Sequence, residues 1–262
     1  MKKILILIVL LVAIVLVWKF GLSKKMTETP AQNETADTTS IAGAVKNAEG
    51  QYEYKKETAY YTIEVTYPGS ISLSGEARAK TRKTMDDFIL ASVSEFETMT
   101  TEFLIPEEKE RLVTMGRKYA FGMEFTEYVS TNYISYKVLR YEDTGGAHPN
   151  TYYNGVAFTK AGDRVMLADL FKLDARYLDR LSAESYKQVT AELQKRSEGE
   201  LSEDALDWIR MGTAPSPEAI QFFYVDANNN LTIIFPPYQV AAYAYGAFEV
   251  KIPLASLADI LK

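Results

Sequence analysis

Cysteine is absent from the 262 residues, and histidine occurs once, as His148. Without cysteine the chain has no disulfide, no thiolate metal site, no cysteine nucleophile and no lipid-modified cysteine anchor. A zinc site would need carboxylates for its remaining protein ligands, and a Ser-His-Asp triad would have to use His148. This composition excludes most of the common kinds of catalytic site, so we expect no catalytic residue, no metal site and no cofactor.

Positive charge is also scarce, because 29 Lys and Arg residues stand against 35 Asp and Glu, for a formal net charge of −6. Binding of nucleic acid needs clustered basic side chains that displace counterions, so we expect no nucleic-acid partner. If this chain binds a partner through charge, a basic protein suits it best. With 47% hydrophobic and 24% charged residues, the composition is that of a globular protein.

Long hydrophobic runs are missing except at the amino terminus. Two lysines precede an unbroken apolar stretch from Ile4 to Trp18, which reaches across a bilayer if Lys19 snorkels. The same arrangement fits a secretory signal peptide that is cleaved after export. Because Trp suits a membrane interface, residues 1–25 are predicted to be an uncleaved anchor, with a cleaved signal as the alternative. Either arrangement places the rest of the chain outside the cytoplasmic membrane.

Sequence periodicity predicts the elements that follow. Residues 26–51 lack an apolar period and are rich in Thr, Ala, Glu and Asn, which predicts a flexible tether. Helical spacing of apolar residues predicts a long helix over 77–100 and a helical region over 178–211. Period-two alternation between residues 119 and 171, interrupted by short turns, predicts an antiparallel meander that includes a strand over 165–171.

The carboxyl-terminal part predicts a hairpin of residues 220–225 and 231–235, a last strand over 248–252 and a short closing helix. The fold class is therefore α+β, with antiparallel sheets and packed helices. We expect two sub-domains, residues 52–143 and residues 144–262, after the membrane segment and the tether.

The stretch from Thr144 to Asn150, Thr-Gly-Gly-Ala-His-Pro-Asn, is the most specific local signal. Its two adjacent glycines can take positive φ, and Pro149 forces His148 toward extended geometry, which predicts a shaped turn between two strands. His148 could act as a general base or contact a partner; the poor catalytic surroundings instead favour a ring that bonds backbone across the loop. Glu142 and Asp143 could pair with His148 or simply face water.

A second candidate site begins where Pro236 and the next proline stop a strand and start a loop that carries Tyr238, Tyr243 and Tyr245. Tyrosine offers a large contact area at low entropic cost, which suits protein interfaces and sugar stacking. The alternative is that these rings cover the edge of a sheet. The predicted ligand-binding residues are Pro236, Tyr238, Tyr243, Tyr245, His148, Asn150 and Tyr152.

Five short motifs follow one another along the carboxyl-terminal part of the chain. They are Thr144–Asn150, Leu-Ala-Asp-Leu-Phe at 167–171, Phe-Pro-Pro-Tyr-Gln-Val at 235–240, Ala-Tyr-Ala-Tyr-Gly at 242–246 and Glu-Val-Lys-Ile-Pro-Leu at 249–254. In this combination the chain from Tyr52 onward resembles the extracytoplasmic domain shared by the bacterial anti-sigma factor RsiV and the non-catalytic front part of the peptidoglycan deacetylase PdaC. The resemblance implies a two-part domain, with residues 52–143 PdaC-like and residues 144–262 RsiV-like.

The resemblance also implies a function. In this family the RsiV domain binds lysozyme, a small basic protein, and this triggers proteolysis of RsiV; in PdaC the domain precedes a separate catalytic domain. Only three residues precede the predicted span and nothing follows Lys262, so we expect neither sigma-factor control nor deacetylation. What carries over is recognition.

We therefore predict a membrane-tethered extracytoplasmic recognition domain, not an enzyme, that binds a lysozyme-like cell-wall-active protein or peptidoglycan. An alternative from another class is a glycan-hydrolysing enzyme that uses carboxylates near the Gly-Gly-Ala-His-Pro loop, where Glu142, Asp143 and Asp169 are available. A third possibility is a structural envelope protein without a ligand.

Overall fold

The computed structural model describes residues 41–262, with the exception of residues 174, 175 and 198. The predicted membrane segment, residues 1–25, lies outside the described residues, as does most of the predicted tether. No helix in the described part combines the length and the hydrophobicity needed to cross a bilayer.

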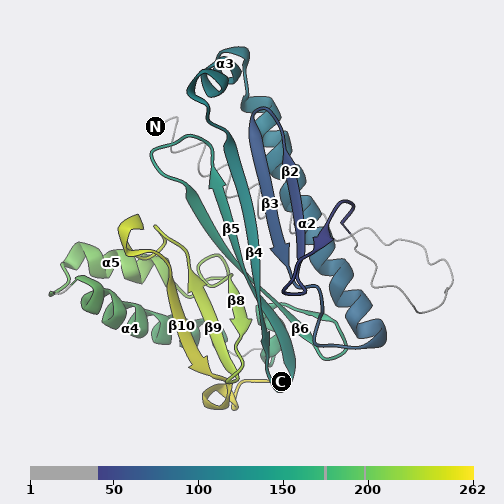
Figure 1. The fold of residues 1–262 in the computed structure, drawn as a ribbon. Coiled ribbons are helices and arrows are strands. Elements are labelled where there is room, and N and C mark those ends of the chain that lie inside the picture. Colours follow the sequence, from purple (N-terminus) through teal and green to yellow (C-terminus); the bar gives the residue numbers. More distant parts are fainter. Residues whose placement is uncertain (1–40, 174–175, 198) are drawn as a thin grey trace. The chain divides into compact units, whose positions relative to one another are not determined.

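Two sheets and four α-helices build the described part, so the predicted α+β class is confirmed (Figure 1). The larger sheet contains, in spatial order, β1 (Val45–Lys46), β2 (Tyr52–Glu57), β3 (Tyr61–Tyr67), β4 (Tyr119–Val129), β5 (Tyr133–Asp143), β6 (Asn150–Thr159) and β7 (Arg164–Val165). The smaller sheet contains β10 (Phe248–Pro253), β9 (Asn230–Phe235) and β8 (Phe223–Val225). The helices are α2 (Gly75–Phe103), α3 (Pro106–Met115), α4 (Tyr177–Ser197) and α5 (Glu203–Gly212), and the 3-10 helices are η1 (Leu167–Leu170), η2 (Tyr243–Tyr245) and η3 (Leu254–Leu257).

The larger sheet is mixed, which corrects the expectation of purely antiparallel sheets. Strands β4 to β7 form the predicted antiparallel meander, but β3 and β4 run parallel, with Tyr61 opposite Tyr119. Parallel neighbours need a crossover connection, and here α2 and α3 supply it. A run of alternating residues indicates a strand but does not say which strand it will pair with.

Two further expectations were wrong at the ends of elements. The strand predicted over 165–171 ends at Val165, because Asp169 accepts a hydrogen bond from the backbone N of Met166 at 2.9 Å and the chain turns into η1. The predicted tether ends earlier than residue 51, because Ile41 is only 2% exposed and Val45 pairs with Glu53. Residues 41–51 therefore belong to the folded unit.

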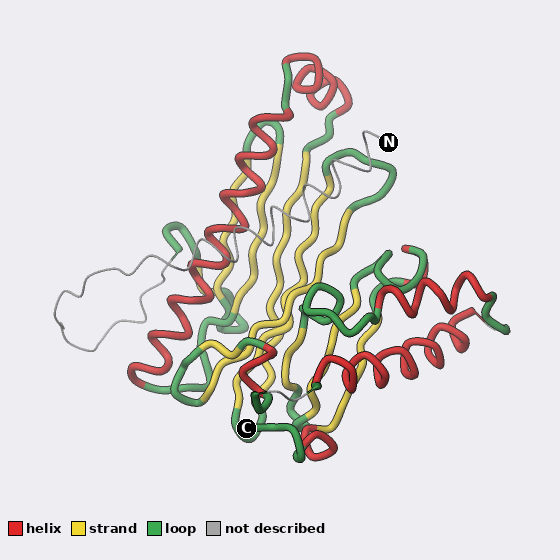
Figure 2. Tube along the Cα trace, turned by 180° about the vertical axis from the view of Figure 1, so that it is seen from behind, coloured by secondary structure: helices red, strands yellow, loops and turns green. Residues whose placement is uncertain are grey.

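Helix α2 covers one face of the larger sheet (Figure 2). Its apolar residues at helical spacing, including Met85, Ile89 and Phe96, are buried against strand residues such as Ile63 and Phe121. Each fully buried side chain of this size contributes roughly 1.5–3 kcal/mol to folding. The predicted helix over 77–100 is thus confirmed, and it begins two residues earlier and ends three residues later than predicted.

The smaller sheet lies on the opposite face of the larger one. Val156 and Phe158 of β6 belong to the core under α2, whereas Ala157 belongs to the core that the smaller sheet, α4 and α5 share. Successive side chains of a strand point to opposite faces, so β6 contributes to both cores. The boundary predicted at residue 144 falls in the loop just before this shared strand.

Gly155 allows the two sheets to approach closely. A Cβ placed on Gly155 would lie 1.8 Å from the carbonyl oxygen of Phe223, so the backbone of β8 packs directly on β6. Nearby, the backbone N of Val225 donates to Oγ of the buried Ser135 at 3.1 Å, which joins β8 to β5. Glycine is required here because any side chain would push the sheets apart.

Candidate functional site

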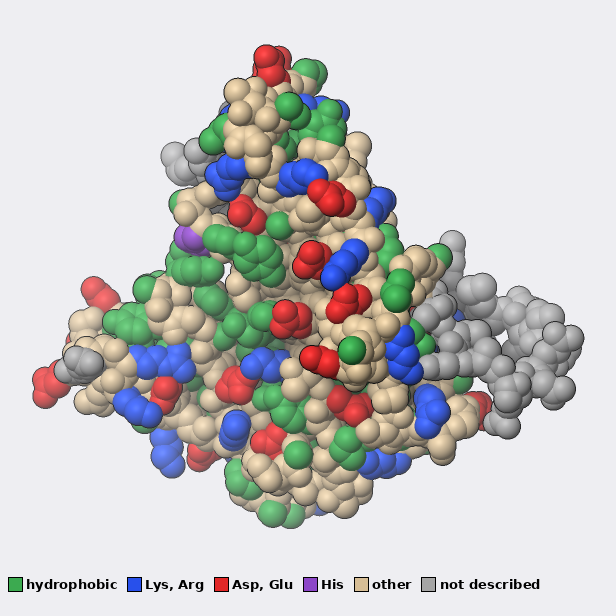
Figure 3. Space-filling view, in the orientation of Figure 1, with side chains coloured by type: hydrophobic (Ala, Val, Ile, Leu, Met, Phe, Trp, Pro, Cys, Tyr) green, Lys and Arg blue, Asp and Glu red, His purple; other side chains and the backbone are tan. Residues whose placement is uncertain are grey.

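Two loops that are about 90 residues apart in the sequence meet at the surface. The loop between β5 and β6 brings His148, and the loop after β9 brings Tyr238 and Tyr243. The His148 ring stacks on Tyr243 with centroids 4.0 Å apart, and the rings of Tyr238 and Tyr243 lie 5.4 Å apart. Figure 3 shows the histidine side chain beside hydrophobic side chains on this face. We call His148, Tyr238, Tyr243 and the adjoining Trp208 the aromatic patch.

Hydrogen bonds hold the His148 ring in one orientation. Its Nδ1 lies 2.9 Å from the carbonyl oxygen of Pro149, and its Nε2 lies 3.2 Å from the hydroxyl of Tyr238. A carbonyl oxygen only accepts, so in the neutral ring Nδ1 carries the proton and Nε2 accepts from Tyr238. The Tyr243 hydroxyl donates to the same Pro149 oxygen at 2.8 Å. The imidazole thus bonds the backbone of its own loop, as expected from its surroundings.

Tyr238 has an unusual backbone conformation for a residue with a side chain. Its φ is +70°, and among the described non-glycine residues only Asn229 shares a positive φ. This conformation costs about 1 kcal/mol for an ordinary L-residue, so surrounding contacts must maintain it. The Nε1 of Trp208 donates to the Tyr238 carbonyl oxygen at 3.2 Å, which holds the peptide on one side. The strained backbone presents a tyrosine that is 55% exposed.

The residue after Tyr238 anchors the loop on its other side. The side-chain nitrogen of Gln239 donates to the carbonyl oxygens of Gly212 and Ala219, both at 2.8 Å. A Cβ on Gly212 would come within 2.2 Å of the Gln239 carbonyl oxygen, so the end of α5 sits directly against this loop. The patch is therefore held by backbone contacts as well as by its own rings.

Helix α5 contributes residues that the sequence patterns did not point out. Trp208 is 36% exposed and Met211 is 70% exposed, while Ile209 between them is buried. Residues three apart share one face of a helix, so Trp208 and Met211 extend the apolar surface beside Tyr238. The sequence alone could have indicated this exposure, because Trp208 and Met211 do not share the helix face on which the buried Ile209 lies. Ser202 caps the helix by accepting from the backbone N of Ala205 at 3.3 Å.

The other predicted site residues take no part in the ring contacts of the aromatic patch. Tyr245 is half-buried and packs on the core that the smaller sheet shares with α4 and α5. Its carbonyl oxygen accepts a hydrogen bond from Arg196 at 2.6 Å. Pro236 accepts from the backbone N of Gln239 at 3.1 Å and so starts the turn that leads into the loop. Asn150 is exposed and stands opposite Glu142 at the end of the β5–β6 ladder.

Tyr152 belongs to a different environment, the core face under α2. Its ring lies 5.7 Å from the guanidinium of Arg140, which is itself only 8% exposed. Arg140 Nε donates to Glu142 at 2.6 Å, and Nη1 donates to Glu95 of α2 at 2.8 Å. These residues form a buried ion cluster, in which burial raises the pKa of Glu142 although Arg140 opposes that effect.

This cluster corrects the expectation that Glu142 pairs with His148 or faces water. Strand β5 continues to Asp143, so Glu142 follows Arg140 on the inward face and is 5% exposed. Asp143 also does not pair with His148; it accepts from the backbone N of Gly145 at 2.9 Å and lies 3.8 Å from Arg117. In the described part of the chain, no three His, Asp or Glu side chains are grouped as metal ligands.

Comparisons with known proteins match the two halves separately. Residues 54–151 match the family model described as "Deacetylase PdaC", and residues 168–255 match the one described as "Protein of unknown function (DUF3298)". The resemblance to the PdaC type of extracytoplasmic domain is therefore confirmed. No curated protein matches the chain.

Solved structures share the fold. A member of the DUF3298 family from Bacteroides fragilis is 20% identical, with a TM-score of 0.52, over 84% of this chain and 92% of that one. A DUF3298 family protein from Pseudomonas aeruginosa is 14% identical, with a TM-score of 0.53, over 81% of this chain and 92% of that one. At these identities the likeness concerns the fold alone, and it extends across both halves.

Proposed function

We propose that this chain, in which a PdaC-type segment precedes a DUF3298-type segment, is a recognition protein whose aromatic patch binds a basic, lysozyme-like cell-wall-active protein. In this proposal residues 1–25 tether the folded unit to the outer side of the cytoplasmic membrane. The observation that carries the proposal is Tyr238, an exposed aromatic side chain held in a strained backbone conformation by contacts on both sides.

Strain of this kind is maintained only where the surroundings impose it, and it clusters at binding sites and other functional positions. The ring of Tyr238 is also pre-ordered, because His148 and Tyr243 hold it before any partner arrives. Binding through pre-ordered rings loses little side-chain entropy, which is why tyrosine and tryptophan dominate interface hot spots. The patch therefore has the composition and the rigidity of a protein-binding surface.

The charge beside the patch favours a basic partner. Helix α5 places Glu203, Asp204 and Asp207 in the turns before Trp208, and only Asp207 of these has an ion pair, with Arg210, among the described residues. The chain as a whole carries a formal charge of −6. Complementary charge around an apolar centre increases the association rate, and its effect weakens as salt screens it.

The environments of the candidate carboxylates favour a binding role over glycan hydrolysis. Glycoside hydrolysis needs one carboxyl group to donate a proton and a second to attack or to activate water. Glu142 is buried against Arg140, Asp143 bonds its own loop, and Asp169 caps η1. Turnover of peptidoglycan by the full chain, abolished in Asp143→Asn, would nevertheless reverse this preference.

The test is binding of lysozyme to the full chain in detergent, measured by calorimetry at low and high salt. Tyr238→Gly removes the ring and also relieves the positive φ, so it deletes the contact without straining the loop. We expect it to weaken binding by at least about tenfold, as expected for a hot-spot residue. Leu90→Ala, on helix α2 at the other face of the larger sheet, removes a side chain that is similarly exposed, at 46%, and should leave the affinity unchanged. Absence of a complex at low ionic strength would reject lysozyme as the partner.

A further inference from the structure

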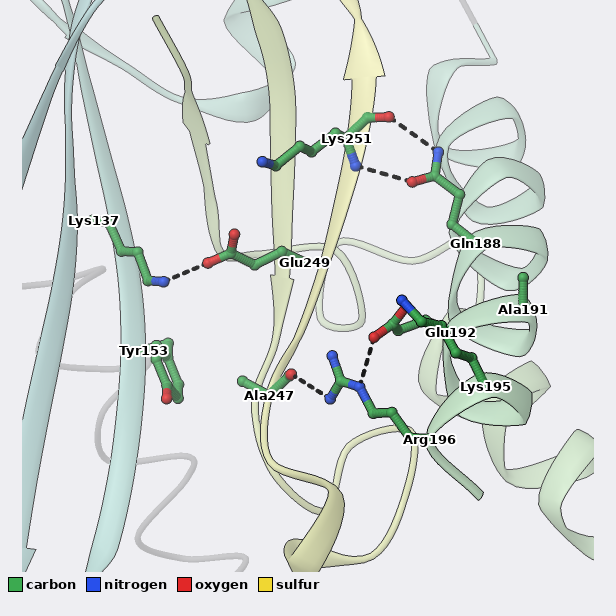
Figure 4. A pocket seen from close by; sticks show the side chains of 10 residues that line it. All are labelled: Lys137, Tyr153, Gln188, Ala191, Glu192, Lys195, Arg196, Ala247, Glu249 and Lys251. Carbon is green, nitrogen blue, oxygen red and sulfur yellow. Dashed lines mark hydrogen bonds and ion pairs between the residues drawn. The ribbon is translucent and has the colours of Figure 1, made fainter. Parts of the chain in front are cut away.

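A groove of about 690 Å³ runs between strands β5 and β6 on one side and helix α4 on the other, with β10 between them (Figure 4). Four cationic side chains line it, together with two carboxylates, Glu192 and Glu249. The cations are Lys137, Lys195, Arg196 and Lys251. Four positive and two negative groups give the lining a formal charge of +2, in a chain whose total is −6. A concave positive region on an acidic protein concentrates anions.

Two of these cations are committed to the structure of the groove itself. Lys137 is paired with Glu249, whose other oxygen accepts from the Tyr224 hydroxyl at 3.2 Å. Arg196 donates to Glu192 at 2.9 Å and to the carbonyl oxygens of Tyr245 and Ala247 at 2.6 and 3.1 Å. These bonds fix the walls, so the groove exists before any ligand enters.

The other two cations are available to a ligand. Among the described residues no carboxylate lies within 4 Å of the ammonium group of Lys251, although, against the effect of burial, its charge helps hydrogen bonds from Asn230 and Asn228 to lower the pKa of Asp226. The backbone N and O of Lys251 are held by the side chain of Gln188 at 3.1 and 3.0 Å. Lys195 is 81% exposed and stands 4.0 Å from Glu192, at the limit of an ion pair. The backbone beneath Lys251 is thus rigid, whereas both lysine side chains remain free to rearrange around an anionic group.

Tyr153 supplies the apolar part of the lining. It comes from β6, and Lys137 Nζ lies 5.5 Å from its ring centroid. An aromatic face flanked by cations matches a molecule that carries both a sugar ring and negative charge, because the ring stacks on C–H groups and the ammonium groups bind the anion. A small inorganic anion would leave the aromatic surface unused.

From this combination we propose that the groove binds an anionic glycan, that is, a saccharide chain bearing phosphate or carboxylate groups. Lys195 and Lys251 contact the anionic groups, and Tyr153 contacts the sugar. This site is separate from the aromatic patch and takes a ligand of opposite charge. The two are joined through η2, since Arg196 holds the carbonyl oxygen of Tyr245 while Tyr243 stacks on His148.

The test uses the full chain and three fluorescent oligosaccharides of equal length: glucose units joined by phosphodiester groups, galacturonate units and neutral glucose units. Fluorescence anisotropy should detect binding of at least one anionic oligomer, and comparison of the first two identifies phosphate or carboxylate as the preferred group. The Lys195→Gln/Lys251→Gln variant should bind roughly tenfold more weakly, since each lost charge-assisted hydrogen bond reduces affinity. Glu192→Gln should bind more tightly, because it removes a negative charge from the lining.

A matched control is Lys160→Gln/Lys187→Gln, which removes the same charge from exposed positions outside the groove. This control and Tyr238→Gly should both retain glycan affinity, and the latter result separates the groove from the patch. Equal loss in the two double-lysine variants would mean diffuse attraction and would overturn the proposal. Equal binding of the neutral oligomer, or no binding of either anionic oligomer at low salt, would do so as well.

Discussion

The two faces of the larger sheet place charged side chains in opposite environments. On the face under α2, Arg140 and Glu142 meet with little access to water, and the partly exposed Glu95 bonds the same guanidinium. On the face that carries the smaller sheet, Lys195 and Lys251 border an open groove. A buried charge must be satisfied by protein partners, so the first cluster is fixed by its own bonds. An exposed charge keeps its hydration until a ligand replaces it, so the second group is suited to binding.

Breaking the buried cluster should give the largest effect. Arg140→Leu leaves the buried Glu142 without its partner, so the carboxyl must either stay charged in a dry environment or bind a proton, and the free energy of unfolding should fall by about 3–5 kcal/mol. Urea titration followed by circular dichroism measures this loss. The Arg140→Met/Glu142→Leu variant removes both charges and should recover most of the stability. If the double variant is no more stable than Arg140→Leu, lost packing and not the unpaired charge explains the effect.

Separating the two faces should have the next largest effect. Gly155→Ala places a methyl group against the Phe223 backbone, so the smaller sheet must shift, at a cost of about 3 kcal/mol. Gly122→Ala is the matched control in the same sheet, because its methyl group would meet its nearest neighbours at an ordinary 3.7 Å. Thermal unfolding of both variants measures the difference, and similar losses in the two would contradict direct backbone packing at Gly155.

The ion pair between Arg111 and Glu108 is exposed, so it should contribute less to stability than the buried cluster around Arg140. Arg111 donates to Glu108 at 2.6 and 2.8 Å, and with a hydrogen bond from Tyr119 it lowers the pKa of Glu108 to about 2. A lowered pKa stabilises the fold above the ordinary value of 4.5, and this contribution disappears as the pH falls toward 2. Glu108→Gln should therefore lower the stability slightly above pH 4.5, pH 7 included, because an exposed ion pair contributes little. The two proteins should converge as the pH falls toward 2, so the stability curve of the variant is flatter between these pH values. Denaturation midpoints measured across this range would show it, and parallel curves for the two proteins would count against the lowered pKa.

Local patterns predicted the elements well but not their partners. Apolar spacing identified α2, and alternation identified the β4–β7 meander, because each pattern is a property of one segment. The parallel pairing of β3 with β4 and the contact of β8 with β6 depend on residues far apart in the sequence. Strand β1 pairs only two residues, too few to produce a period.

For the candidate site too, single residues could be predicted from the sequence but their contacts could not. His148, Tyr238 and Tyr243 were identified individually from their loops, but only the fold places the histidine ring on a tyrosine some 90 residues away. Trp208 joined them from a helix that looked like a solvated surface. The groove combines side chains of β5, β6, α4 and β10, none of which forms a motif alone.

Strand β6 has a consequence for cooperativity. Because alternate residues of this one strand complete both hydrophobic cores, neither half of the folded unit can melt while the other keeps its full packing. Calorimetry should thus record one endotherm rather than two. Expression of either half alone would expose an apolar strand face, so each half should aggregate unless it is produced together with the other.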